Sequence, residues 1–511
     1  MYNGKSKKIF VEWIQTMRKI ILMMILATIL LSGCQNENRE IKSIDDLKNA
    51  RIGSWPECGY ELKARKVLPN AKFVHLDFLS DLVQNLKQNK IDAFVIGKIY
   101  AENLKFDGVE VDYLPQSLGD VPLGYIFTKN ERGQKLCGQM NEFIASIEKN
   151  GELDALKSKW LRSDESKRAF TKSKLSGENG KLMIRTDAQS PPFDYLREGQ
   201  VVGFEVEIID KFCVAYGYDY EIKVDVFETM LTDVTLGKID IGMDAIEILP
   251  EREKSMLFSN PIQIEQTVAI INSESKGVSN ITERIKLSLI NELRWKMILE
   301  GALTTLTITF FSIILGTLLG LAIYLLYREK TPANSLIDAI YRTLQGVPTM
   351  VLLLFFYYVV FGSINLSASV VAVVVFSIIL SISVFTLIKS GAESISSGQM
   401  EAALSLGFSE RQAFVKFILP QVIRNNFANY QLQLNILLME TAIVGYIAVQ
   451  DLTRTADLIR ARTYDAFIPI ITIALVYLLL SKVLFLITDV ISRKIDPKNR
   501  KKAEILPGVK L

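Results

Sequence analysis

The most informative segment of this chain reads GQMEAALSLG at residues 398–407 and continues to ILPQ at residues 418–421. Strongly apolar runs flank the segment, but the segment itself is too polar to lie in lipid, so it must face water. Its paired alanines allow close backbone approach, Gly407 permits a sharp break, and Pro420 lacks a backbone donor. The pattern predicts a short helix, a turn and the start of a second helix.

This arrangement resembles the EAA coupling loop of ABC importer permeases. A Glu-Ala-Ala triplet is followed after three residues by glycine, and then by Ile-Leu-Pro at the distance typical of that family. The resemblance implies that four residues present the loop to a separate ATPase: Glu401, Ala402, Ala403 and Gly407. The alternative is an amphipathic cytoplasmic linker without a docking role.

The composition predicts a soluble part followed by a membrane part. The chain has 511 residues, of which 49% are hydrophobic, and long apolar runs begin only at about Gly301. The length is too great for one ordinary domain. The net charge of +3 is small, and no basic block is interleaved with aromatic residues, so nucleic-acid binding has little support.

The N-terminal 34 residues have the pattern of a secretion signal. A basic pair at residues 18–19 precedes an apolar run from Ile20 to Leu31, which ends in Leu-Ser-Gly-Cys at residues 31–34. This end resembles a bacterial lipobox, which implies cleavage before Cys34 and lipidation of its thiol. An uncleaved signal anchor is the alternative.

The remaining cysteines predict neither a metal site nor a disulfide framework, because they are odd in number and widely spaced. They are Cys58, Cys137 and Cys213. We therefore expect no metal and no cofactor in this chain.

Five apolar segments are each close to the ~20 residues that cross a bilayer. They lie at about 301–327, 343–362, 368–388, 427–447 and 466–491. With the soluble part outside the cytoplasm, five spans place the C-terminus inside, where basic residues cluster at 493–502, as the positive-inside rule requires.

One loop disagrees with that topology. It carries Arg454, Arg460 and Arg462, yet five spans place it outside. The nearby acids are candidate partners for these arginines: Asp451, Asp457 and Asp465.

The fourth apolar segment carries amides and a carboxylate, and such groups avoid lipid. Two explanations are equally good: the segment lines the transport pathway, or its polar groups bond to neighbouring helices.

The membrane half resembles the polar amino acid permease family over nearly its whole length. The resemblance rests on GALTTL at 301–306, QGVPT at 345–349 and META at 439–442. It implies a permease domain over residues 298–495 and a cytoplasmic tail over 496–511. Thr386 occupies a position where the family usually carries glutamate, which weakens the case for a basic amino acid as substrate.

The soluble half alternates strands and helices, which predicts an α/β fold. Residues 180–275 resemble the first lobe of a periplasmic amino-acid-binding protein. They begin with GKLMIRTD at 180–187 and include FSNP at 258–261. Residues 41–165 resemble the second lobe and the closing helices. We expect one two-lobed receptor that is circularly permuted, with a linker at 166–179 joining its old termini and with the chain continuing from lobe 1 directly to the membrane. Two incomplete receptors are the alternative.

The family resemblance gives candidate ligand residues. Arg252 falls on the family's carboxylate-binding arginine, whose planar fork can hold a carboxylate with two bonds. Asp187 and Phe193 lie on its ligand-facing loop. A surface ion pair is the alternative role for Arg252.

Departures from the family pattern concern the same pocket. The family's ammonium-binding aspartate aligns with Gly97, and its carboxylate-binding loop aligns with residues 57–59. Asp244 and Glu247 stand where hydroxyl-bearing residues are usual. The pocket is therefore expected to prefer a more cationic or differently shaped solute, unless these two acids are solvated loop carboxylates.

Together these patterns predict the membrane subunit of an ABC importer: a two-lobed α/β receptor followed by an all-α bundle of five transmembrane helices. It captures a small polar solute, expected to be an amino acid, outside the inner membrane. No phosphate-binding G-x-x-x-x-G-K-S/T pattern occurs, so we expect no enzyme activity and a separate ABC ATPase dimer. A second permease copy, in a homodimer, would complete the pore within the lipid bilayer. A ligand-gated channel with a receptor-like sensor domain is the alternative.

Overall fold

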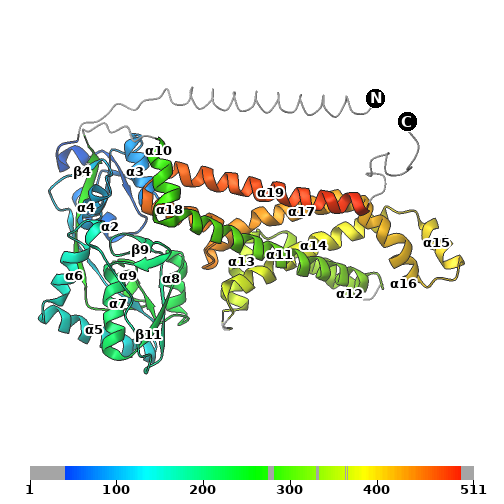
Figure 1. Cartoon of the computed structure of the whole chain (residues 1–511), viewed down its shortest axis with the longest axis horizontal. Helices are drawn as coiled ribbons and strands as arrows, with labels where there is room; N and C mark the ends of the chain where they lie inside the picture. The colour runs from blue at the N-terminus through cyan, green and yellow to red at the C-terminus, as the bar shows by residue number, and fades with distance from the viewer. Residues whose placement is uncertain (1–40, 274–280, 330–332, 363, 365, 496–511) are drawn as a thin grey trace.

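The computed structural model describes residues 41–273, 281–329, 333–362, 364 and 366–495. The predicted signal sequence with Cys34 and the predicted C-terminal tail lie outside these residues. The described chain has an α/β part that ends at Asn272 and a helical part that begins at Ile281. Figure 1 shows the α/β part at one end of an elongated helical bundle.

One lobe of the α/β part is built on a six-stranded sheet. Its strand order is β2-β1-β3-β14-β4, and β5 also pairs with β14. The strands are β1 (Arg51–Ser54), β2 (Lys72–His75), β3 (Ala93–Gly97), β4 (Val111–Tyr113), β5 (Gly119–Leu123) and β14 (Gln263–Asn272). The helices of this lobe are η1 (Ile44–Leu47), α2 (Gly59–Val67), α3 (Leu79–Lys87) and α4 (Lys98–Phe106).

The other lobe is built on a five-stranded sheet of order β11-β7-β12-β6-β13. These strands are β6 (Ile126–Phe127), β7 (Lys181–Thr186), β11 (Asp219–Val224), β12 (Ile241–Gly242) and β13 (Leu257–Phe258). Its helices are α5 (Glu131–Lys149), α6 (Glu152–Trp160), η2 (Glu165–Lys167), α7 (Phe204–Tyr216), α8 (Phe227–Thr235) and α9 (Pro250–Glu253). A small antiparallel sheet of β8 (Gln189–Ser190), β9 (Asp194–Arg197) and β10 (Gln200–Val202) lies beside α7.

The chain crosses between the two lobes twice, from β5 to β6 and from β13 to β14. The second crossing differs from the sequence-based expectation, in which residues 180–275 form one lobe and run on to the membrane. Strand β14 instead lies inside the other sheet, antiparallel to β3, β4 and β5. The reason is its run of fully buried apolar residues, Val268 to Ile270, which fills the core of that sheet.

The helical part begins with α10 (Ile281–Ile285), η3 (Lys286–Ile290) and η4 (Asn291–Leu293). It continues with α11 (Arg294–Tyr327), α12 (Ala333–Gln345), α13 (Thr349–Phe355), η5 (Phe356–Val360), α14 (Ala368–Glu393), α15 (Ser397–Ser405), α16 (Glu410–Ala413) and η6 (Phe414–Ile418). It ends with α17 (Leu419–Glu440), η7 (Thr441–Ile447), α18 (Leu452–Thr463) and α19 (Phe467–Ile495).

Three helical stretches of the described chain are long and apolar enough to cross a membrane: 281–327, 368–393 and 467–495. Two bent pairs raise the number to five if each counts as one span, namely 334–345 with 349–360 and 410–447 with 452–463. Helices α11 and α14 pack closely because glycines lie between them. A Cβ on Gly316 would lie 2.8 Å from a carbonyl oxygen on α14, and a Cβ on Gly320 would lie 2.6 Å from another. A larger residue at either position would therefore push the two helices apart.

The segment at residues 398–407 folds as its sequence predicts. Helix α15 ends at Ser405, Gly407 adopts a left-handed φ of +86°, and α16 begins three residues later, at Glu410, after a Ser409 capping box. Pro420 lies in the first turn of α17, directly after the π-helical η6, where no donor is lost. Figure 1 shows this loop at the end of the bundle farthest from the α/β part.

Candidate ligand cleft and its contact with the membrane helices

Arg252 and Glu247 pair with each other. The guanidinium Nη1 of Arg252 lies 3.0 Å from Oε2 of Glu247, and the Glu247 carboxylate also accepts a hydrogen bond from the backbone N–H of Gly59. Gly59 opens α2 in the other lobe, so this bond joins the two lobes. The candidate carboxylate-binding arginine is therefore engaged by the chain's own carboxylate.

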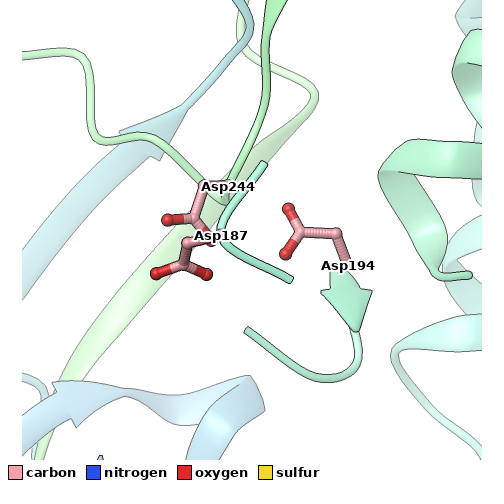
Figure 2. Close-up of side chains that lie close together, drawn as sticks. All are labelled: Asp187, Asp194 and Asp244. Carbon is pink, nitrogen blue, oxygen red and sulfur yellow. The ribbon is translucent and has the colours of Figure 1, made fainter. Parts of the chain in front are cut away.

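Three aspartates meet on one side of the cleft: Asp187, Asp194 and Asp244. Each offers a carboxylate oxygen, and the three oxygens lie within 4.8 Å of one another. Figure 2 shows Asp187 and Asp244 on neighbouring loops, with Asp194 facing them from the start of β9. Asp187 and Asp244 lie close enough that each affects the pKa of the other's carboxyl group. Two of the sequence-predicted residues are thus brought together, with Asp194 as a third that sequence reasoning missed.

The most buried aspartate of this cluster lacks compensating donors. Asp194 is 0% exposed, and within the described chain neither of its oxygens has a hydrogen-bond donor. Glu205, at the start of α7, is equally buried, and its Oε2 accepts from Ala245 N at 2.9 Å while Oε1 has no donor. Burial raises the pKa of Glu205 to about 7. Burial, with added repulsion from the neighbouring acids, also holds the pKa values of Asp194 and Asp244 well above the ordinary range.

A further acidic residue, Glu265 on β14, occupies a place that sequence reasoning left empty. A Cβ on Gly97 would collide with Oε2 of Glu265 and would lie 2.9 Å from the hydroxyl oxygen of Tyr60. Glu265 thus fills the space beside the position that aligns with the family's ammonium-binding aspartate. Its carboxylate accepts from Ile99 N at 3.0 Å and from Gln263 Nε2 at 3.1 Å, and burial raises its pKa to about 7.

A row of aromatic rings lies between these acids. The ring centroids of Tyr60 and Trp55 are 6.3 Å apart, those of Trp55 and Tyr100 5.8 Å, and those of Tyr100 and Phe193 5.3 Å. Phe193 belongs to one lobe and the other three residues belong to the other. The row therefore joins the two lobes, and the ring of Phe193 is fully buried in it.

Helix α18 of the bundle contacts both lobes through its arginines. Arg460 Nη2 lies 2.6 Å from Oδ1 of Asp81 on α3. Arg462 contacts Asp107 and Glu165 at 3.3 Å each and Glu292 at 3.1 Å. Arg460 and Arg462, which disagreed with the positive-inside rule, therefore pair with acids of the α/β part and with Glu292 of the helical part.

Arg454 reaches the loop that carries Asp187. Its Nη2 donates to the carbonyl oxygen of Asp187 at 3.3 Å and also to that of Asp225. When the side-chain amide of Gln189 is turned so that its oxygen faces Arg454, that oxygen accepts hydrogen bonds from the same guanidinium. The cation opposes the burial that raises the pKa of Asp187.

Only one of the three acids expected to pair with these arginines does so. Asp457 lies 3.1 Å from Arg460. Asp451 instead caps α18 by accepting from the backbone N–H groups of Thr453 and Arg454, and Asp465 pairs with Arg284 at 2.7 Å.

The polar residues of α17 bond to other helices. Asn435 is 2% exposed and accepts from Ser481 Oγ on α19 at 2.7 Å, while Gln431 donates to the Phe485 carbonyl. Thr349 donates to Glu440 at 3.1 Å. These contacts favour the helix-bonding explanation for these residues, although Asn426 and Tyr430 also line a mostly apolar cavity of about 170 Å³ between α11, α14 and α17.

The loop at residues 398–407 presents a mixed surface. Glu401, Ala402 and Gly407 are exposed, whereas Ala403 is only 4% exposed and packs inward. Leu406, which the sequence pattern did not single out, is 75% exposed.

An α/β receptor-like part fused to a bundle with a polar far-end loop defines a membrane transport subunit. Residues 312–497 match the family model described as "Binding-protein-dependent transport system inner membrane component". The putative glutamine transport system permease protein GlnP of Rickettsia typhi is 30% identical over 200 residues, which are 39% of this chain and 92% of that protein. The chain therefore belongs to the binding-protein-dependent transport permease family.

Solved structures are similar to each part. A chain of an amino acid ABC transporter crystallised with histidines shares 30% identity, with 43% of this chain and all of that chain covered and a TM-score of 0.38. The probable amino-acid ABC transporter extracellular-binding protein ytmK of Bacillus subtilis shares 12% identity, covering 45% of this chain and 85% of that chain with a TM-score of 0.25. The two large sheets of the α/β part, each with its own strand order, show that this part has two lobes.

Proposed function

We propose that this chain is the receptor and permease subunit of an ABC importer that takes up a small polar solute. The family it belongs to consists of transport permeases, and nothing among the relatives favours a ligand-gated channel. The α/β part captures the solute outside the inner membrane, and five spans carry it inward. A separate ABC ATPase dimer supplies the energy, and a second copy of the chain completes the pore.

The observation that carries this proposal is the position of α18. Its arginines contact acids or carbonyl oxygens of both lobes, while the loop at residues 398–407 lies at the opposite end of the bundle (Figure 1). One end of the bundle thus touches the candidate ligand cleft, and the other end offers a surface for a motor. A solute released by lobe opening would meet the bundle directly.

The strand order supports the circular permutation. Each lobe contains residues from both sides of the stretch 166–179, since β1 to β5 share a sheet with β14, and β6 shares one with β7, β11, β12 and β13. We propose one complete receptor in which residues 41–165 and 180–275 each contribute to both lobes. The chain returns to the lobe of β1 to β5 at β14.

The proposed roles follow the positions of the side chains. Asp187, Phe193, Asp244, Glu247 and Arg252 line the ligand cleft. Glu401, Ala402 and Gly407 face the ATPase, and Ala403 holds α15 against the bundle. Cys34 is the proposed lipidation site.

The test is the double variant Glu401→Lys with Gly407→Trp. We expect loss of ATP-driven uptake in proteoliposomes that contain the chain and its ATPase, together with unchanged solute binding to the purified chain. Uptake equal to that of the parent chain would overturn the assignment of the loop.

A further inference from the structure

The donors that would hold a solute carboxylate are already in use. Arg252 and the Gly59 N–H both bind the Glu247 carboxylate, which is buried between the lobes. A carboxylated solute would have to displace Glu247 and leave this buried acid without its partners, which is costly. The cleft is therefore built for a solute without a carboxylate.

The charges that face the cleft are mostly negative. The acids are the half-buried Asp187 and the buried Asp194, Glu205, Asp244, Glu247 and Glu265, whereas the cations that act on them within the described chain include Arg252, Arg454 and, beside Glu265, Lys98. Buried carboxylates are stable when a cation compensates them. The excess of acids predicts a cationic solute.

The acids lie in two groups, one at each end of the cleft. Asp194 faces Asp187 and Asp244 at one end (Figure 2). Glu265 and Glu247 lie near Tyr60 at the other end, close enough that both raise the pKa of its hydroxyl. Tyr60 is 1% exposed, and its hydroxyl has no hydrogen-bond partner within the described chain. A buried, unpartnered hydroxyl beside a carboxylate is an incomplete binding site.

The aromatic row connects these two ends. Tyr60 begins it beside Glu265, and Tyr100 lies beside Ser190 and Asp244 at the other end. Trp55 and Phe193 lie between and beside these rings. Such rings bury methylene groups and attract ammonium groups at their faces.

We infer that the cleft, acting within the importer proposed above, binds a linear aliphatic diamine. One ammonium lies among Asp187, Asp194 and Asp244, the methylene chain lies along the aromatic row, and the second ammonium lies at Glu265 and Tyr60. A divalent metal ion at the three aspartates is the competing occupant. The Glu265 end and the aromatic row would have no role in such a site.

The experiment is calorimetric titration of the full-length chain in detergent, without ATPase. The probes are 1,4-diaminobutane, 1,5-diaminopentane, L-lysine, L-glutamine and Mn²⁺. We expect binding of at least one diamine and of neither amino acid. Glu265→Gln and Asp244→Asn should each weaken diamine binding by about tenfold or more, since each removes one charge-assisted contact.

Matched controls are Glu148→Gln and Asp154→Asn, which change exposed acids on α5 and α6 and should leave binding unchanged. The thermal midpoint of each variant without ligand shows whether it is folded. Glu247→Ser adds a gain-of-function arm: it frees Arg252 and should allow L-lysine to bind.

The inference is overturned if neither diamine binds, if the parent chain binds an amino acid, or if Mn²⁺ binds and depends on Asp244 but not on Glu265. These outcomes are separate from the importer proposal. Diamine binding without ATP-driven uptake would contradict only the importer, and uptake of an amino acid would contradict only the diamine.

Discussion

Arg454 of α18 donates a hydrogen bond to the carbonyl oxygen of Asp187 at 3.3 Å, although 267 positions separate the two residues in the sequence. Asp187 belongs to the acidic end of the candidate cleft. A membrane-bundle residue is thus bonded to the backbone that positions a candidate ligand group, so the state of the cleft and the position of α18 are physically linked.

Arg454→Ala should uncouple binding from transport. The variant loses the contacts to the carbonyl oxygens of Asp187 and Asp225, but it removes no acid from the cleft. We expect diamine binding within about threefold of the parent value, because these bonds go to the backbone, and ATP-driven uptake reduced by about tenfold or more. Arg162→Ala, at an exposed receptor arginine, is the control. Equal uptake by both variants would show that α18 plays no such part.

The Arg460 and Asp81 pair should contribute to holding the receptor on the bundle. Its atoms are 2.6 Å apart and the arginine side chain is only 11% exposed. A double-mutant cycle of Arg460→Ala and Asp81→Ala should give a coupling free energy of about 1 kcal/mol in unfolding of the full chain, because the pair is partly shielded from solvent. Strictly additive single effects would indicate that the pair does not form.

The free energy of unfolding of the unliganded chain should fall as the pH rises from about 4.5 to 7. Burial raises the pKa values of Glu205 and Glu265 from 4.5 to about 7, so the folded chain holds more protons than the unfolded chain in this window. Stability then decreases with pH and levels off above about 7.

Glu265→Gln should flatten this dependence, since a neutral amide removes one of the titrating groups. The thermal midpoint measured from pH 4.5 to 8 checks the change in slope, and Glu148→Gln should retain the parent slope. A parent midpoint that rises with pH over this range would contradict the burial of these two acids.

Glu247→Ser should alter specificity. With the competing carboxylate removed, the guanidinium of Arg252 and the Gly59 N–H become available to a solute. The ratio of L-lysine to diamine affinity should rise by about tenfold or more, as measured by titration. No change in this ratio would mean that Arg252 does not face the solute.

Local sequence patterns predicted the loop at residues 398–407 and the alternation of strands and helices, because caps, glycine conformations and apolar periodicity depend on neighbouring residues. Gly407 is the clearest example, since its left-handed φ follows from residue type. Long apolar runs likewise indicated the bundle, while its number of spans stays a prediction.

The cleft was less predictable because its contacts join distant segments. Glu265 was missed because β14 was assigned to the wrong lobe, and strand pairing with β3 is visible only in the fold. The engagement of Arg252 by Glu247 and the contacts of Arg454, Arg460 and Arg462 also depend on tertiary packing. Gly97 was the signal in the sequence that could have led to Glu265. The family carries an acid at that position, so its absence indicates that another residue supplies the carboxylate.

The most direct test of the importer is solute accumulation in proteoliposomes that contain the chain and its ATPase. The receptor side should face outward and ATP should be trapped inside, with the solute that binds the purified chain supplied outside. The account predicts accumulation against a gradient that requires ATP and is lost in the Glu401→Lys, Gly407→Trp variant. Solute flux that proceeds without ATP and stops at equal concentrations would contradict it.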